Sequence, residues 1–126
     1  MIEFSVRLAN RPGQLATLAR LFADAGIDIE ALAAVTDNGQ THIRIVVEHA
    51  AQARRLLMAA DVEFDERDIL DTFVPRGTGG LANIAESLAR ADVNIDSLYL
   101  LHTNAEGFHL AITVSDVDSA TEALAG

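Results

Sequence analysis

The sequence predicts an α+β fold in which a βαββαβ unit is repeated in tandem and the second copy lacks its last strand. Three observations lead to this prediction. A turn at 10–16 recurs at 76–82, so that Gly79 stands 66 residues after Gly13. Before each turn apolar residues alternate with polar ones, which is typical of strands. After each turn apolar residues recur at three- and four-residue spacing, which is typical of a helix, before a second alternating run begins.

The first copy can be read element by element. Pro12 and Gly13 open a helix, because proline has the φ angle of a first helical turn and glycine lets other groups come close. Gly26 stands where a left-handed residue ends a helix, and an Asp-Asn-Gly run ending at Gly39 predicts a β-hairpin. The expected elements are a strand at 2–9, a helix at 13–25, strands at 27–36 and 41–47, a helix at 50–60 and a short strand at 62–64.

The second copy follows the same order with one residue inserted in its hairpin. The expected elements are a strand at 69–74, a helix at 80–91, a strand at 93–98, a turn at 104–107, a strand at 108–114 and a helix at 120–125. No residues remain for a last strand, so a sheet edge is left to be covered. We therefore divide the chain into repeats at 1–66 and 67–126, and we expect it to form a homodimer.

Composition excludes several functional classes. The 126 residues are 50% hydrophobic and carry 9 basic and 19 acidic side chains, a net charge of -10, which disfavours binding to nucleic acid or to an anionic membrane surface. Because there is no cysteine, disulfides, thiolate zinc sites and thiol nucleophiles are excluded. No basic-flanked leader is visible, and the apolar runs are shorter than the roughly 20 residues that cross a bilayer. We expect a cytoplasmic protein.

The first turn and the helix after it resemble a known family. Asn-Arg-Pro-Gly-Gln-Leu at 10–15, followed by Leu-Phe-Ala-Asp-Ala-Gly-Ile-Asp-Ile at 21–29, is similar to the opening motif of the ACT domain. The likeness extends over essentially the whole chain, twice, and suggests a small stand-alone tandem ACT protein. The resemblance implies a ferredoxin-like fold and a non-enzymatic regulator that binds an amino acid. It also implies allosteric association with itself or with a metabolic enzyme or regulator.

The resemblance also implies where the ligand lies, which is between two domains beside the first turn and the start of the second strand. The turn position falls on Asn10 and Arg76, and the strand position falls on Asp28 and Asn94. Asp28 would then receive the ammonium of an amino acid and Arg76 its carboxylate. The ligand-binding residues expected from the resemblance are Asn10, Arg11, Pro12, Gly13, Gln14, Leu15, Asp28, Arg76, Gly77, Thr78, Gly79, Gly80, Leu81 and Asn94.

Structural interpretations of the same residues stay open. Gly13 and Gly79 would be needed in tight turns whether or not a ligand binds. Asp28 and Asn94 would cap backbone amides after a helix, and Arg76 would be an ordinary solvated charge. A ligand-free protein-interaction module and a small acyl-phosphate hydrolase are the alternative functions.

Other catalytic and cofactor signals are weak. Residues 77–82 satisfy the G-x-G-x-x-A pattern of dinucleotide-binding turns, but the expected helix leads into a hairpin and the first copy has Pro-Gly there. The four histidines lack the spacing of a metal set. Serine residues occur without an elbow motif or an adjacent base. We therefore expect no cofactor, no metal and no catalytic residue.

Overall fold

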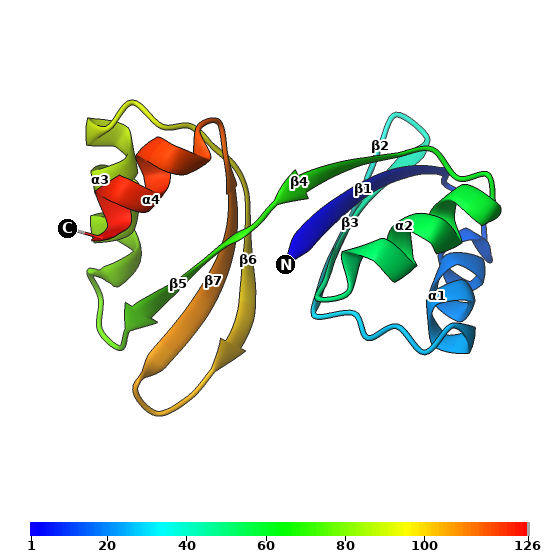
Figure 1. Ribbon diagram of the computed structural model, residues 1–126, viewed down its shortest axis with the longest axis horizontal. Coiled ribbons are helices and arrows are strands. Elements are labelled where there is room, and N and C mark those ends of the chain that lie inside the picture. Colours follow the sequence, from blue (N-terminus) through cyan, green and yellow to red (C-terminus); the bar gives the residue numbers. More distant parts are fainter. Residues whose placement is uncertain (126) are drawn as a thin grey trace. The chain divides into compact units, whose positions relative to one another are not determined.

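The computed structural model describes residues 1–125. The chain divides into two compact units, Met1–Arg67 and Asp68–Gly126, and each is described by itself below. The boundary lies one residue after the one expected from the repeat. In each unit the two helices lie on one face of an antiparallel sheet (Figure 1).

The first unit contains six elements. The strand order of its four-stranded sheet, here called sheet A, is β2-β3-β1-β4, so β2 and β4 are the edges. β1 and β2 both pair antiparallel with β3, and Ile2 lies opposite Val47 while Asp37 lies opposite Gln40. The elements are β1 (Ile2–Ala9), α1 (Gln14–Asp24), β2 (Ala31–Asp37), β3 (Gln40–Val47), α2 (Ala50–Ala59) and β4 (Phe64–Asp68).

The second unit contains five elements and a three-stranded sheet, here called sheet B, with the order β5-β7-β6. β4 and β5 are separated by the single residue Ile69. β6 pairs with β7 in a register that shifts twice, between Ile95 and Ser97 and between Leu100 and His102. The elements are β5 (Leu70–Pro75), α3 (Gly80–Arg90), β6 (Ile95–Thr103), β7 (Gly107–Val114) and α4 (Val117–Ala125).

Each unit has a hydrophobic core between its helices and its sheet. Successive side chains of a strand point to opposite faces, and in β1 and β3 every second one meets a helix, while Glu3 and Val46 on the other face are buried as well. Phe4 packs edge-on against Phe64 with ring centroids 5.5 Å apart, which attaches the short edge strand β4. The core of the first unit is centred on Phe4, Val6, Leu18, Phe22, Ile43, Ile45 and Leu57. The core of the second unit is centred on Val74, Leu88, Val93, Leu110, Ile112 and Val114.

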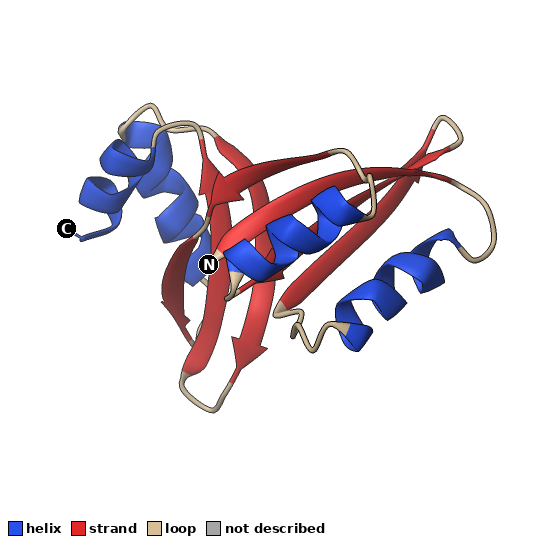
Figure 2. Cartoon of the chain, turned by 45° about the vertical axis from the view of Figure 1, so that its right-hand side comes forward, coloured by secondary structure: helices blue, strands red, loops and turns tan. Residues whose placement is uncertain are grey.

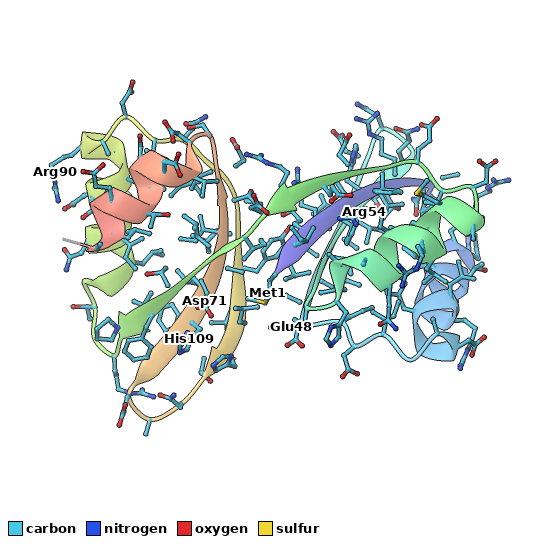
Figure 3. All side chains as sticks on the ribbon, viewed as in Figure 1. Met1, Glu48, Arg54, Asp71, Arg90 and His109 are labelled. Carbon is cyan, nitrogen blue, oxygen red and sulfur yellow. The ribbon has the colours of Figure 1, made fainter. Side chains whose placement is uncertain are left out.

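One ion pair joins a helix to the edge of sheet A. Arg54 in α2 donates two hydrogen bonds to the carboxylate of Glu66 in β4, at 2.7 and 2.6 Å. Arg54 is labelled in Figure 3, where it projects from α2. The hydrogen bond from Arg54 lowers the pKa of Glu66 below its usual value, because it stabilises the charged carboxylate.

The α+β fold and the tandem βαββαβ repeats are confirmed, and residues 1–125 contain no last strand in the second copy (Figure 2). The predicted start of the second strand at 27 is wrong, because β2 begins at Ala31. The amides of Gly26 and Ile27 bond back to helix carbonyls, and Ile27 and Ile29 then anchor an irregular segment to the core. Alternating burial therefore arose here without a strand.

Smaller differences concern the ends of elements. Besides β2, three of them differ from the predicted bounds by more than one residue, because the ends of elements leave little periodic signal. β4 occupies Phe64–Asp68 rather than 62–64, β6 occupies Ile95–Thr103 rather than 93–98, and α4 begins at Val117 rather than at 120. No helix in the described part of the chain is long and apolar enough to cross a membrane.

Candidate functional site

The turn between β1 and α1 leaves backbone donors free at the start of a helix. Gly13 precedes α1 with φ at 89°, a left-handed conformation that glycine adopts without strain. No side chain caps the helix, and the hydroxyl and the amide of Thr17 both donate to the Gly13 carbonyl. Within residues 1–125, the amides of Leu15 and Ala16 have no acceptor. Free amides at a helix N-terminus favour an anionic group such as a carboxylate.

A cavity of about 250 Å³ lies beside this turn. Its apolar part comes from β1, β2 and β3, and its polar rim comes from the turn and the first turn of α1. Thr36 and Thr41 lie opposite each other in the hairpin with their hydroxyl oxygens 3.0 Å apart. The lining residues are Leu8, Ala9, Asn10, Arg11, Gln14, Leu15, Ala34, Thr36, Thr41 and Ile43.

Four of the expected ligand-binding residues therefore line one cavity, namely Asn10, Arg11, Gln14 and Leu15. Arg11 is exposed and forms no ion pair with any described residue, so its guanidinium is available to an anion. The turn also contains Pro12 and Gly13, which are exposed. The cavity can hold a small molecule with a carboxylate and a short apolar group.

The sequence prediction missed the strand residues of this cavity. Ala34, Thr36 and Thr41 belong to a hairpin whose register puts them beside the turn. The signal was present, because a two-residue Asn-Gly turn sets which residues lie opposite each other.

Asp28 does not lie at this cavity. It is exposed in the segment before β2, and Ala31, the first residue of β2, lies opposite Val46 near the end of β3. Asn10 lies at the other end of the sheet, where its amide donates to the Gly39 carbonyl at 3.1 Å. With about 3.3 Å per strand residue, the two ends of a seven-residue strand are roughly 20 Å apart. Within one unit the structure does not bring Asn10 and Asp28 together.

The turn of the second unit is built differently. Gly77 has φ at 141°, whereas Gly79, the counterpart of Gly13, has φ at -108°. A Cβ at Gly80 would collide with the Val74 side chain, so this glycine is required for helix-to-strand packing. Thr78 and Leu81 are exposed.

Arg76 is held by the β6–β7 hairpin. Its Nε donates to the Ala105 carbonyl at 2.8 Å and its Nη2 to the Asn104 carbonyl at 3.0 Å, while its backbone amide donates to the Glu106 carbonyl at 2.8 Å. The Asn104 side chain accepts hydrogen bonds from the amides of Glu106 and Gly107 and so fixes the same turn. In this conformation the guanidinium of Arg76 stabilises the turn between β6 and β7 through hydrogen bonds.

Asn94 lies at the opposite end of sheet B from Arg76. Its amide donates to the hydroxyl of Ser115 at 2.9 Å, and the amide of Ser115 donates to the Asn94 carbonyl at 3.0 Å. These bonds extend the pairing of Ile95 with Val114. Pro75, next to Arg76, lies opposite Gly107 at the start of β7.

Titratable groups also meet on the face of sheet B opposite its helices. Asp71 in β5 and His109 in β7 lie together in Figure 3, with Oδ1 and Nδ1 2.9 Å apart. The His109 ring stacks on His102 at 4.5 Å and is tilted against Phe73 at 5.2 Å. Among residues 1–125 no group of three or more His, Cys, Asp or Glu residues is arranged to hold a metal ion.

The first unit is a ferredoxin-like α+β module with a ligand-sized cavity beside its first turn. Residues 2–63 match the model of the ACT domain family, which confirms the resemblance seen in the sequence for this unit. No curated protein matches the sequence.

Solved structures share the fold over 98% of the chain. Protein BT0572 from Bacteroides thetaiotaomicron superposes with a TM-score of 0.88 at 22% identity, over 85% of its own length. The ligand-free regulatory subunit of aspartate kinase from Thermus thermophilus superposes with a TM-score of 0.72 at 17% identity, over 88% of its length. A structure of aspartokinase alpha and beta subunits gives a TM-score of 0.68 at 21% identity, over 88% of that chain. At these identities the likeness shows the fold alone.

Proposed function

We propose that this protein is a non-enzymatic regulator that binds an amino acid at the turn cavity of its first unit and passes the bound state on through association. The observation that supports it best is the coincidence of the ACT family turn with a cavity of about 250 Å³. The free amides of Leu15 and Ala16, together with Arg11, would hold the ligand carboxylate. The apolar part of the cavity would take a short side chain.

The edge strand β2 supports a homodimer. β2 pairs with β3 on one side only, and Leu32 and Val35 are 42% and 64% exposed along it. If β2 pairs antiparallel with β2 of a second copy about Ala34, Leu32 of that copy lies opposite Thr36, at the cavity. The same two-fold pairing carries the start of the partner strand, preceded by Asp28, towards Asn10. Asp28 would then receive the ligand ammonium from the other chain.

This arrangement explains how binding would be transmitted. A ligand that contacts the turn of one chain and Asp28 of the other stabilises the dimer over the monomer, because it binds only the paired state. A metabolic enzyme or regulator that recognises one of these states would sense the amino acid. A protein with the same fold, the regulatory subunit of aspartate kinase from Thermus thermophilus, is itself a regulatory subunit.

A thermal-shift screen of the twenty amino acids tests the proposal. A ligand that binds only the native state stabilises it by RT ln(1 + [L]/Kd), so one hit at a hundred times its Kd adds about 2.7 kcal/mol. Asp28→Asn should reduce the affinity for that amino acid at least about tenfold. Asp24→Asn, an exposed change on α1, should leave it unaffected. If no amino acid shifts the melting temperature, the proposal fails.

Light scattering separates the two parts of the proposal. We expect the ligand to increase the dimer fraction at low micromolar concentration. If an amino acid binds and the average mass does not change, the proposal that two chains share the site is overturned. A ligand-free interaction module is the second candidate, because exposed leucines recur at equivalent edge positions of both units, with Leu32 and Leu98 at 42% and 40% exposure. An interaction module of this kind would form a dimer whose mass in light scattering does not change when any amino acid is added.

A further inference from the structure

The first unit has a second and larger hollow, on the face of sheet A that the helices do not cover. Its volume is about 470 Å³, and its lining residues come from β1, from β3, from the start of β4 and from the residue before β4. In Figure 1 α1 and α2 lie on the opposite side of these strands. The lining residues are Ser5, Val6, Arg7, His42, Ile43, Arg44, Glu63, Phe64 and Asp65. We call this hollow the sheet groove.

Charge is separated across the sheet groove. Arg7 lies opposite His42 in the β1–β3 register, and Ser5 lies opposite Arg44. Basic groups therefore occupy β1 and β3. Because Phe64 packs inward on Phe4, its neighbours Glu63 and Asp65 belong to the other face, where they form an acidic wall.

The strand order fixes the width of this arrangement. β1 lies between β3 and β4, and neighbouring strands are about 4.8 Å apart, so β3 and β4 are roughly 10 Å apart. A positive and a negative row therefore run side by side, separated by one or two strand spacings. A neutral or singly charged ligand would leave one row without a partner.

The groups that face the sheet groove are available. Within residues 1–125, Arg7, Glu63 and Asp65 form no ion pair, and all three are exposed. Arg44 is different, because its Nη1 is 3.1 Å from the carboxylate of the buried Glu3. Arg44 is thereby held in place, whereas Arg7, the other described arginine that lines the groove, forms no ion pair.

We propose that the sheet groove is a second ligand site, and that it takes a short zwitterionic peptide such as a dipeptide. The peptide carboxylate lies on Arg7 and His42, and its ammonium lies on Glu63 and Asp65. A free amino acid does not fit this pattern, because a single carbon separates its two charges. An extended dipeptide spans about 7 Å, which matches the spacing of the two rows. This inference does not depend on the amino-acid site at the turn.

Glycylglycine titrated into the full chain in a calorimeter tests the proposal. We expect saturable binding at millimolar concentration with one site per chain. N-acetyl-glycylglycine lacks the ammonium and glycylglycine amide lacks the carboxylate, and each should bind at least about tenfold more weakly. Equal binding of all three compounds, or no binding of glycylglycine, would overturn the proposal.

Two variants locate the site, and two matched changes serve as controls. Arg7→Gln and Asp65→Asn should each weaken glycylglycine binding by about tenfold. Arg20→Gln and Asp24→Asn change an exposed pair on α1 and should have no effect. Unchanged far-UV circular dichroism of the Arg7 and Asp65 variants shows that they fold. Binding that survives both groove changes contradicts the assignment.

A further control separates the sheet groove from the turn cavity. Gly13→Val changes only the turn and should leave glycylglycine binding intact. Arg7→Gln should leave unchanged the melting-temperature shift produced by the amino acid found in the screen. Loss of both ligands in either variant would show that a single site binds them, which would overturn the second site while leaving the proposed function standing.

Discussion

The first turns of the two units come from one repeated motif and have opposite properties. In the first unit Gly13 is left-handed and a Cβ there would meet nothing within 4 Å. In the second unit Gly80 is packed against Val74, and Arg76 is bonded to two hairpin carbonyls. The first turn stands beside a cavity, whereas the second is fastened to its own sheet. A shared glycine pattern therefore does not carry a shared role.

The difference follows from which glycine carries the unusual backbone. Pro12 fixes φ just before Gly13, so the left-handed residue falls directly at the helix start. Thr78 stands in the position of Pro12, and the positive φ has moved to Gly77. The Gly79 backbone is in an ordinary region, and the Arg76 side chain, just before Gly77, bonds the neighbouring hairpin.

The largest expected effect concerns close packing in the second unit. A Cβ at Gly107 would overlap the Val74 carbonyl oxygen and crowd Phe73, so Gly107→Ala should cost about 3 kcal/mol of unfolding free energy. Urea unfolding followed by far-UV circular dichroism reports on both units, and the fluorescence of Tyr99, the one tyrosine in a chain without tryptophan, reports on the second unit.

Gly39→Ala at the other hairpin is the matched change. Its Cβ meets nothing within 4 Å, so only the left-handed φ of 76° opposes it, at about 1–2 kcal/mol. Equal losses in the two variants would mean that the hairpin of the second unit is no more tightly packed than that of the first.

The next effect concerns binding. Gly13→Val should reduce affinity for the amino acid found in the screen at least about tenfold, because a branched side chain at a left-handed position deforms the turn. Gly79→Val places the same side chain at an ordinary φ in the other turn and should leave affinity unchanged. Isothermal titration of both variants distinguishes them. If Gly79→Val weakens binding as much as Gly13→Val does, the two turns act alike and the comparison fails.

A smaller effect distinguishes two roles of Arg76, which are to stabilise the hairpin turn and to bind the carboxylate of a ligand. Arg76→Gln should lower the stability of the second unit by about 1 kcal/mol, because it removes two hydrogen bonds to carbonyls. Asn10→Ala at the equivalent position should be neutral for stability, since no described residue bonds its side chain. The opposite result, a stable Arg76→Gln protein that has lost affinity, would favour the clamp expected from the family resemblance.

The smallest effects concern acid stability. In the second unit Asp116 accepts hydrogen bonds from the amide and the hydroxyl of Ser119 at the start of α4, and these bonds lower its pKa. Arg54 lowers the pKa of Glu66 in the first unit in the same way. A folded-state pKa below the unfolded value gives stability that is present above about pH 4 and is lost as pH falls through the folded value.

Asp116→Asn and Glu66→Gln should therefore flatten the fall of melting temperature between neutral and acidic pH. Asparagine remains a good helix cap, so the first change removes the charge and keeps the cap. Calorimetric scans at pH 7 and pH 3.5 provide the measurement. A melting temperature that falls as steeply in the variants as in the unchanged chain would show that these two carboxylates do not govern acid stability.

The sequence allowed the fold to be predicted because its signals are local. Periodicity placed the helices and strands, and the repeat of Gly13 at Gly79 placed the two units. The start of β2 was wrong because Ile27 and Ile29 reach the core from a loop, and alternation cannot distinguish a loop from a strand.

The candidate site could be predicted only in part. The turn residues that line the cavity are consecutive in sequence, so a motif could find them. The fastening of Arg76 depends on carbonyls 28 and 29 residues away, which no local pattern contains. The sheet groove depends on the register of three strands and on the inward packing of Phe64, and its polar residues look like any solvated sheet face in the sequence.

The connection between β4 and β5 consists of Ile69 alone. One residue contributes two soft dihedral angles, whereas a flexible tether of many residues lets its ends move independently. The backbone therefore leaves an edge strand of sheet A and enters an edge strand of sheet B with only two soft dihedral angles between them. A few glycines inserted after Ile69 would break no hydrogen bond within either sheet, so we expect each unit to keep its fold.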